Sequence, residues 1–229
     1  MVSDRPYVLL SCAMSVDGYI DDLTGERLTL SNAADLDRVD AVRATMDAIM
    51  VGANTVRRDD PSLLIKSQAR RIDRVSRGLP EDLLKVTVTS GGTLDPGSRF
   101  FTTGTSPKLV YAGEDVAEDL AARLGAAATV IDMGARVELP VLLADLSARG
   151  VRRLMVEGGG AVHTAFLSAG LADELHLAVA PFLIGDPGAP RFTYPSVFPQ
   201  TPEHPMRLAE VRKIGEVALL RYTMGHHER

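Results

Sequence analysis

A carboxylate and three glycines stand together in the stretch LMVEGGGAVHTAF, residues 154–166. Apolar residues lead into Glu157, and Gly158, Gly159 and Gly160 precede a run that can form a helix. The N–H groups at the start of a helix are unpaired and partly positive, and glycines let an anion approach the backbone closely. We therefore expect this glycine loop to hold a diphosphate; the alternative is a tight turn without a ligand.

The glycine loop differs from the common nucleotide-binding motifs. Read as GxGxxG, its third glycine position falls on His163, and the absence of GKS or GKT excludes a P-loop. At His163 we expect a partly buried histidine with satisfied hydrogen bonds rather than a catalytic one. The chain lacks GxSxG and an HxE–CxxC combination, so we predict neither a serine hydrolase nor a zinc deaminase, and no metal site.

A second group of chemically useful side chains surrounds the adjacent carboxylates Asp59 and Asp60, which precede a proline. If one of them is desolvated, its pKa rises and it can hold or deliver a proton near neutral pH. The alternative is a pair that stabilises the loop, since Asp before Pro is common in turns. The Thr55 hydroxyl can bond a phosphate or an amide, and Arg43 and Lys66 are cations suited to a substrate phosphate.

Composition excludes several classes of protein. The chain has 229 residues, 45% of them hydrophobic, and a formal charge of −5 with both signs interspersed, which gives no basic face for nucleic acid. No apolar run approaches the roughly 18 residues of a membrane helix. Cys12 is the only cysteine, and we expect a buried, inert thiol. We predict a single domain over residues 1–229 in a cytoplasmic protein.

The elements that position these residues alternate between strand and helix, which favours an α/β domain with a mostly parallel sheet and an antiparallel C-terminal edge. The polar run 54–61 is expected to be a loop with at most one helical turn, and the Arg-rich run 66–82 a solvated surface excursion. His176 alternates within a strand and is expected to be structural. The expected strands are 7–14, 48–52, 85–90, 108–113, 128–133, 152–156, 172–185, 206–214 and 216–224, and the expected helices are 33–46, 116–124, 139–149 and 161–170.

Four of the expected strands end in small or polar residues, in the stretches AMSVDG, VGANTVRRDDP, VTSGG and VEGGG. The carboxyl ends of parallel strands lie at the same edge of a sheet, where ligands of open α/β sheets bind. We therefore predict that these four ends form one binding site.

In this order, the stretches AMSVDG, VGANTVRRDDPSL, VTSGG and LMVEGGGAVHTAFLSAGLADELHLAVAPFLIG resemble the reductase domain of the bacterial riboflavin-biosynthesis deaminase/reductase, in the dihydrofolate reductase-like superfamily. The resemblance spans residues 6–220. It implies a three-layer α/β fold, NADPH, a homodimer, and reduction of the ribosylamino group of a pyrimidine 5′-phosphate to a ribitylamino group. The deaminase half has no counterpart here, so the resemblance implies a stand-alone reductase.

The resemblance also implies roles for individual residues. We expect Asp59 to assist proton transfer and Glu157 to fix the pyrimidine. Many members carry serine and tryptophan where this chain has Arg27 and Thr29, and an arginine where it has Lys66, which lacks the planar fork. The implied NADPH contacts are Met14, Thr55, Asp59, Ser90 and residues 159–165, which include Gly159, Gly160, Ala161, Val162, His163 and Thr164; the implied substrate contacts are Arg27, Arg43, Leu63, Lys66 and Glu157.

Three alternatives stay open. A dihydrofolate reductase needs an acid on its first helix, where Asp35, Asp37 and Asp40 lie without a clear apolar pocket. A nucleotide-binding protein without catalysis, or a reductase of a modified pyrimidine or pterin in a specialised pathway, fits the same motifs. The preference between NADPH and NADH is also open, although Ser90 and Arg57 or Arg58 could meet a 2′-phosphate.

Overall fold

The computed structural model describes residues 5–25 and 28–225, and the chain divides into two compact units. We name residues 40–155 the central unit, and residues 7–39 with 156–225 the terminal unit. Helix α1 (Ala33–Arg43) begins in the terminal unit and ends in the central one. That the whole chain behaves as one domain stays a prediction.

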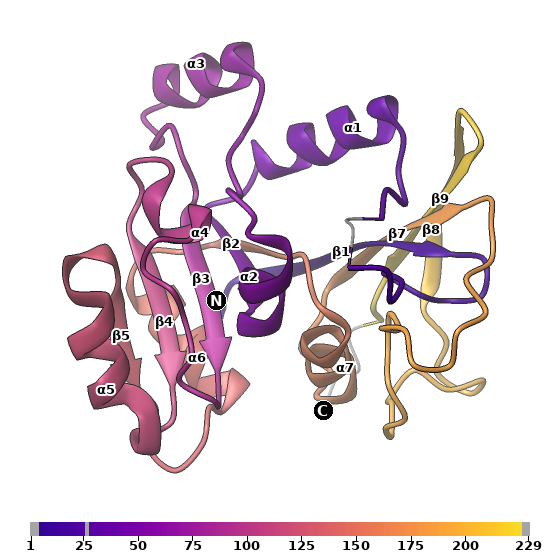
Figure 1. Ribbon diagram of the computed structural model, residues 1–229. Helices are drawn as coiled ribbons and strands as arrows, with labels where there is room; N and C mark the ends of the chain where they lie inside the picture. Colours follow the sequence, from indigo (N-terminus) through magenta and orange to yellow (C-terminus); the bar gives the residue numbers. More distant parts are fainter. Residues whose placement is uncertain (1–4, 26–27, 226–229) are drawn as a thin grey trace. The chain divides into compact units, whose positions relative to one another are not determined.

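The central unit contains five strands in the order β5-β4-β3-β2-β6. The pairs β2–β3, β3–β4 and β4–β5 are parallel, and all five residues of β2 are buried, as expected for a short apolar run in a covered sheet. Helix α5 (Glu114–Leu124) packs against β4 and β5, and α2 (Ala53–Asp59) against β2 and β3 (Figure 1). The strands are β2 (Ala48–Gly52), β3 (Leu84–Thr89), β4 (Lys108–Ala112), β5 (Thr129–Asp132) and β6 (Arg153–Val156).

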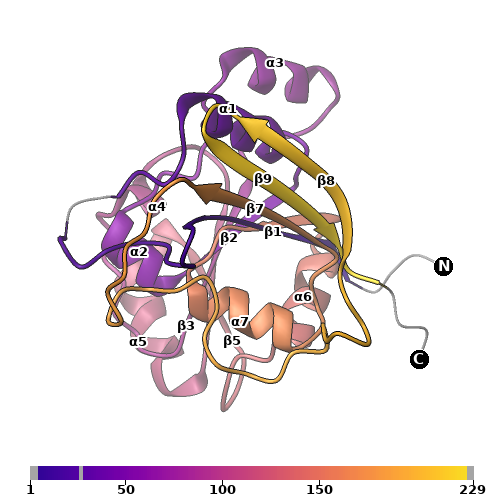
Figure 2. The ribbon, with the colours of Figure 1, turned by 90° about the vertical axis from the view of Figure 1, so that its right-hand side faces the viewer.

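The terminal unit contains four strands in the order β1-β7-β9-β8 (Figure 2). Strand β1 (Tyr7–Ser15) pairs in parallel with β7 (Glu174–Ala180). Strand β9 (Val217–Thr223) is antiparallel to both β7 and β8 (Arg207–Ile214), and the β8–β9 turn contains Gly215 at φ +60°. Helix α7 (Gly160–Ser168) follows the glycine loop. These pairings confirm the predicted α/β class, with mostly parallel strands and antiparallel C-terminal ones.

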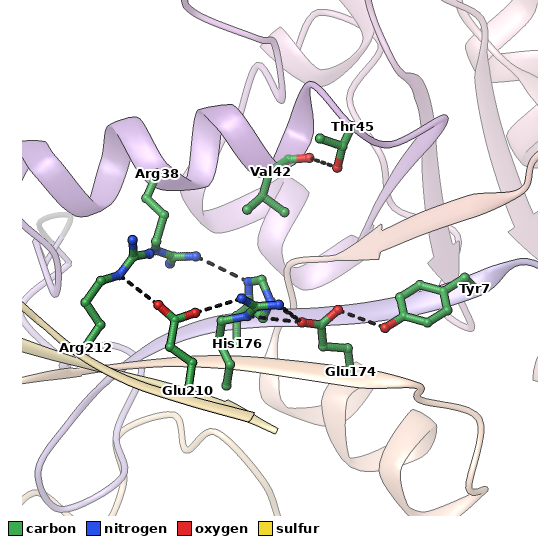
Figure 3. A network of polar contacts seen from close by, with 9 residues as sticks. Tyr7, Arg38, Val42, Thr45, Glu174, His176, Glu210 and Arg212 are labelled. Carbon is green, nitrogen blue, oxygen red and sulfur yellow. Dashed lines mark hydrogen bonds and ion pairs between the residues drawn. The ribbon is translucent and has the colours of Figure 1, made fainter. Parts of the chain in front are cut away.

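A charged network stabilises the terminal unit (Figure 3). Glu174 accepts hydrogen bonds from the Tyr7 hydroxyl at 2.8 Å and from Arg221 Nη2 at 2.6 Å, and its other close partner is His176 Nε2 at 2.8 Å. These bonds, with that from His176 first, lower the pKa of Glu174 to about 2. Arg38 of α1 lies 3.3 Å from His176 Nδ1, so the network joins the helix to the sheet. His176 is buried within it, in line with its predicted structural role.

Two runs predicted as loops are helical. Residues 68–76 form α3 (Gln68–Ser76), and the side chain of Ser67 caps the N-terminus of this helix. Its inward residue is Arg74, which is 1% exposed and donates to the carbonyls of Ala44 and Met46. Because a guanidinium fills the buried position, no apolar side chain marks the inward face of this helix. The predicted loop is wrong there, although most of the helix is exposed, as expected of a surface excursion. The polar run 54–61 is likewise mostly helix, since α2 spans seven residues.

Smaller differences concern ends and short elements. Strand β7 stops at Ala180, before a proline, instead of extending to residue 185. Cys12 is half-buried rather than buried, and burial raises the pKa of its thiol, which disfavours the reactive thiolate. Within the described part of the chain, no helix has the length and apolar character needed to cross a membrane. The remaining helices are α4 (Arg99–Thr102), the 3₁₀ turn η1 (Gly125–Ala127) and α6 (Leu139–Ala148).

Candidate functional site

The glycine loop joins strand β6 to helix α7 in the terminal unit. Glu157 is half-buried, Gly158 has φ +115°, and the Gly158–Gly159 peptide is cis. Gly159 is the N-cap of α7, and no side chain caps this end. The Gly159 carbonyl already accepts the N–H groups of Val162 and His163, at 2.9 and 3.1 Å. An uncapped first turn with a favourable dipole suits an anionic group, as the sequence predicts.

His163 departs from the prediction of a satisfied, partly buried histidine. Its side chain is 0% exposed, and neither ring nitrogen has a hydrogen-bond partner among the described residues. Burial lowers its pKa to about 4, against weaker opposing effects of the Val156 carbonyl and the Glu157 carboxylate. The ring packs against Phe192, with centroids 5.3 Å apart, and a β-carbon on Gly158 would lie 3.1 Å from its Cε1. His163 is therefore a neutral group beneath the loop.

The turn after β1 is held by its own polar side chains. Met14 is half-buried near the strand end, and the Ser15 hydroxyl both donates to Asp17 at 2.5 Å and accepts from the Tyr19 N–H at 3.0 Å. The Asp17 carboxylate also accepts the Gly185 N–H at 2.8 Å. These bonds, with that from Ser15 first, lower the pKa of Asp17. Arg27, an expected substrate contact, lies outside the described residues.

In the central unit, the two adjacent carboxylates have different environments. Thr55 and Asp59 are four residues apart on α2 and so lie on one face of that helix. Asp59 is exposed rather than desolvated. Asp60 ends the helix in the left-handed region at φ +39°, and its Oδ1 accepts the Arg99 N–H at 2.5 Å. Asp60 thus stabilises the loop, which is the alternative to a proton-transfer role that the sequence leaves open for the adjacent carboxylates.

The end of β3 lies at the same edge as the start of α2, because Gly52 pairs with Val88. Ser90 follows β3 and is exposed. Two arginines hold the next loop: Arg57 Nη1 donates to the Thr93 carbonyl at 2.9 Å, and Arg123 Nη1 donates to the Gly92 carbonyl at 2.7 Å. They share an open hollow of about 330 Å³, whose lining consists of Arg57, Thr93, Leu94, Asp95 and Arg123. Arg123 comes from α5 and carried no signal in the sequence.

The structure brings together three of the expected substrate contacts. Arg43 is half-buried, and its Nη1 donates to the carbonyl of Leu64 at 3.1 Å. Leu63 is 4% exposed with φ +51°, so its side chain faces the core and only its backbone is available to a ligand. Lys66 is exposed, and its backbone N–H lies 2.5 Å from Asp40 Oδ1. The sequence does not reveal Asp40 as part of this group, because two of its three partners are backbone N–H groups.

Comparisons with known proteins agree with these observations. The family model described as RibD C-terminal domain matches residues 6–220. A 2,5-diamino-6-ribosylamino-4(3H)-pyrimidinone 5′-phosphate reductase of Archaeoglobus fulgidus is 36% identical over 213 residues, covering 93% of this chain and 95% of the relative. A protein of the same name from Methanothermobacter thermautotrophicus is 37% identical over 182 residues, covering 79% and 80%.

A solved structure shows the same fold. A pyrimidine reductase-like protein of Corynebacterium diphtheriae matches with a TM-score of 0.83 at 22% sequence identity, covering 97% of this chain and 93% of that protein. The family match includes every stretch on which the predicted resemblance rests, from AMSVDG to VAPFLIG. The resemblance and the dihydrofolate reductase-like fold class are therefore confirmed: the chain belongs to the RibD C-terminal domain family.

Proposed function

We propose that this chain is an NADPH-dependent reductase of a ribosylaminopyrimidine 5′-phosphate in riboflavin biosynthesis. The substrate is 5-amino-6-(5-phosphoribosylamino)uracil or its diamino analogue, and the product carries a ribitylamino group. The observation that carries the proposal is the uncapped glycine junction between β6 and α7, in a chain 36% identical over 213 residues to a reductase of this class. The reduction adds a hydride to the sugar carbon bound to nitrogen and a proton to the sugar oxygen released by ring opening.

NADPH supplies the hydride when it is bound, and the residues of this chain fit such a group. The first turn of α7 has no side-chain cap, and its dipole favours a diphosphate there. His163 is fully buried, so it supports the loop from beneath rather than touching the coenzyme. The residues that we assign to coenzyme binding are Met14, Thr55, Asp59, Ser90, Gly158, Gly159, Gly160, Ala161, Val162 and Thr164.

The substrate phosphate needs cations, and Arg43 and Lys66 supply them. The exposed ammonium of Lys66 neutralises a phosphate as a point charge, without the bidentate geometry of arginine. We assign Glu157 to hydrogen bonds with the pyrimidine ring. The backbone of Leu63, and Arg27, complete the proposed substrate contacts.

Asp59 is the proposed proton-handling group. Because it is exposed, it becomes desolvated only when substrate and coenzyme cover it. Asp59→Asn keeps the size and removes the titrating group, so it should lower kcat by roughly 10²-fold and weaken NADPH binding far less. Equal losses in turnover and NADPH affinity would leave Asp59 a binding role only.

Dihydrofolate reduction is disfavoured by two of the three acids of α1, Asp35 and Asp40. Asp35 is 1% exposed and is paired with Arg38 at 2.6 Å. Asp40 is 4% exposed and bonded to Lys66, Ser67 and Arg70. Both carboxylates are therefore engaged by the protein itself and are not free to meet a pterin.

A steady-state assay separates these functions. NADPH oxidation with the ribosylaminopyrimidine phosphate, and not with dihydrofolate, is the expected result. Oxidation with dihydrofolate alone supports the rival reductase, and consumption of a modified pyrimidine or pterin alone supports a specialised pathway. Binding of NADPH in calorimetry without turnover of any of these substrates would make the chain a nucleotide-binding protein.

We also propose a homodimer in the cytoplasm. Strand β8 is the last in the order of the terminal unit, and its Leu208 and Val211 side chains are 51% and 63% exposed. Exposed apolar residues on an edge strand favour pairing with another chain. Sedimentation velocity should show a dimer for the native chain and a monomer for Val211→Asp; a native monomer would contradict the proposal.

A further inference from the structure

We propose that Asp40 is a positioning residue: it fixes the backbone of Lys66 so that the ammonium of Lys66 stands where the substrate phosphate binds. The inference rests on the proposed function, because that function assigns the phosphate to Lys66. All the contacts that carry it lie within the central unit. Asp40 itself does not touch the substrate in this proposal.

Asp40 binds both sides of the Lys66–Ser67 peptide segment. Its Oδ1 accepts the Lys66 N–H at 2.5 Å, and its Oδ2 accepts the Ser67 N–H at 3.1 Å and Arg70 Nη1 at 2.9 Å. The side chain is 6% exposed, so water has little access to these donors. A buried carboxylate with three donors holds a backbone more firmly than a surface contact does.

The segment between α2 and α3 has no regular structure of its own and depends on such anchors (Figure 1). The Arg99 N–H binds Asp60 at one end, and Arg43 binds the Leu64 carbonyl in the middle. Ile65 is 1% exposed and Lys66 is exposed, so successive side chains alternate between core and solvent. Fixing the Lys66 backbone therefore fixes the point from which its side chain extends.

These partners keep the carboxylate of Asp40 ionised and balance its negative charge. Burial by itself raises the pKa of Asp40, but the Lys66 N–H, Arg70 and the Ser67 N–H together bring it below the ordinary value. The pairing with Arg70 also limits repulsion between Asp40 and an incoming phosphate. An asparagine at position 40 would offer one acceptor oxygen to three donors, and its NH₂ group would face another N–H.

Kinetics of Asp40→Asn test the proposal. We expect KM for the phosphorylated substrate to rise about tenfold, close to the rise in Lys66→Gln, with the NADPH dissociation constant unchanged. The double variant should be no worse than Lys66→Gln alone, because both changes remove one interaction. A substrate without the phosphate should show equal KM values for the native chain and all three variants. Asp40→Glu keeps the charge but displaces it, so it should also raise KM. This variant tests the proposal if Asp40→Asn does not fold.

Asp145→Asn is the matched control. Asp145 is a partly buried carboxylate of the same unit that accepts the Tyr111 hydroxyl at 2.6 Å and Arg149 Nε at 2.7 Å. This variant should lose stability but keep the native KM. If KM is raised in Lys66→Gln but is native in both Asp40→Asn and Asp40→Glu, the positioning role of Asp40 is overturned and the phosphate assignment of Lys66 stands. Native KM values in Lys66→Gln as well overturn the phosphate assignment on which the inference rests, while turnover of the substrate still supports the reductase.

Discussion

The carbonyl oxygen of Arg191 faces the α-carbon of Gly160 so closely that a β-carbon on Gly160 would lie 2.0 Å from it. Arg191 belongs to the segment that follows β7 and returns to α7, where the Tyr194 N–H binds Thr164 Oγ1 at 2.9 Å. Thr164 Oγ1 in turn donates to the Gly160 carbonyl at 2.7 Å. The third glycine of the loop is therefore required by packing within the protein, before any ligand is considered.

Gly160→Ala should accordingly displace the start of α7 or the 191–194 segment. Overpacking of this kind costs about 1–3 kcal/mol of unfolding free energy, and the displaced helix start should also weaken NADPH binding. Urea unfolding and calorimetry with NADPH measure the two effects.

Gly113→Ala is the control for this change. Gly113 also stands between a strand and a helix, but a β-carbon there would lie 3.4 Å from the Gly134 carbonyl oxygen and 3.7 Å from that of Ala135, which are ordinary contacts. Because Gly113 is the N-cap of α5 and alanine caps less well than glycine, this variant should lose no more than about 1 kcal/mol of unfolding free energy, and it should bind NADPH as the native chain does. If Gly160→Ala is as stable as Gly113→Ala and binds NADPH normally, the close approach to Arg191 does not constrain the loop.

His163 should make stability depend on pH in the acid range. Its folded pKa of about 4 lies below the unfolded value near 6.5, so between these values the unfolded chain binds the proton more tightly. Unfolding free energy should fall as pH drops from 6.5 to 4, by up to about 3 kcal/mol. His163→Leu removes this group, and urea unfolding at several pH values should show a smaller fall. A parallel pH dependence in the two proteins would mean that His163 is protonated as easily in the folded state.

The sequence predicts elements well where burial and periodicity agree. The run AIMVG is short and apolar, begins after Asp47 and ends in a glycine, and it forms β2 within those limits. The β8–β9 hairpin is found because Gly215 interrupts two alternating runs. Helix α3 is missed because Arg74 occupies the position that an apolar residue normally marks.

For the site, the sequence identifies residues at strand ends but not the partners that hold them. Arg43, Leu63 and Lys66 do come together, as the resemblance implies. Arg123 could not be found, because it reaches the loop after β3 from a distant helix. Asp40 was considered only as an acid, since a bond to a backbone N–H leaves no pattern in the sequence.

Lys85 of β3 should make stability rise with pH, as His163 does, but in the alkaline range. It is 0% exposed, and its ammonium donates to the carbonyls of Phe100 at 3.0 Å and Thr103 at 2.7 Å. Burial lowers its pKa to about 8, below the unfolded value of 10.5, so the unfolded chain binds more protons between these values. Unfolding free energy should rise from pH 8 to 9.5, below the range in which tyrosines begin to titrate.

Lys85→Met tests this assignment. The variant lacks the titrating group, so its unfolding free energy should stay flat from pH 8 to 9.5, measured by urea unfolding. It should also be less stable than the native chain at pH 9.5, because the carbonyls of Phe100 and Thr103 lose a donor. A rise with pH in the variant equal to the native one would assign the alkaline effect to another group.

Arg57 and Arg123 should decide the choice between NADPH and NADH. Both line the hollow beside the loop that follows β3. Arg123 donates to the Gly92 carbonyl through Nη1, whereas Arg57 donates to the Thr93 carbonyl through Nη1 and to Asn54 Oδ1 through Nη2. A guanidinium carries five N–H donors, so both arginines keep donors for a phosphate. The two coenzymes differ by one phosphate on the adenosine ribose. Arg57→Gln and Arg123→Gln should therefore each raise KM for NADPH about tenfold, the loss of roughly one charge-assisted hydrogen bond, and leave KM for NADH unchanged.

Binding of adenosine 2′,5′-bisphosphate and of adenosine 5′-monophosphate separates this effect from damage to the loop. The first ligand should bind more weakly to each variant, and the second should bind as to the native chain. Arg136→Gln is the control, because Arg136 has a side chain that is 83% exposed and pairs with Glu138 away from the hollow. Equal losses for both adenosine phosphates would show that the arginines hold the loop through Gly92 and Thr93 and do not read the additional phosphate.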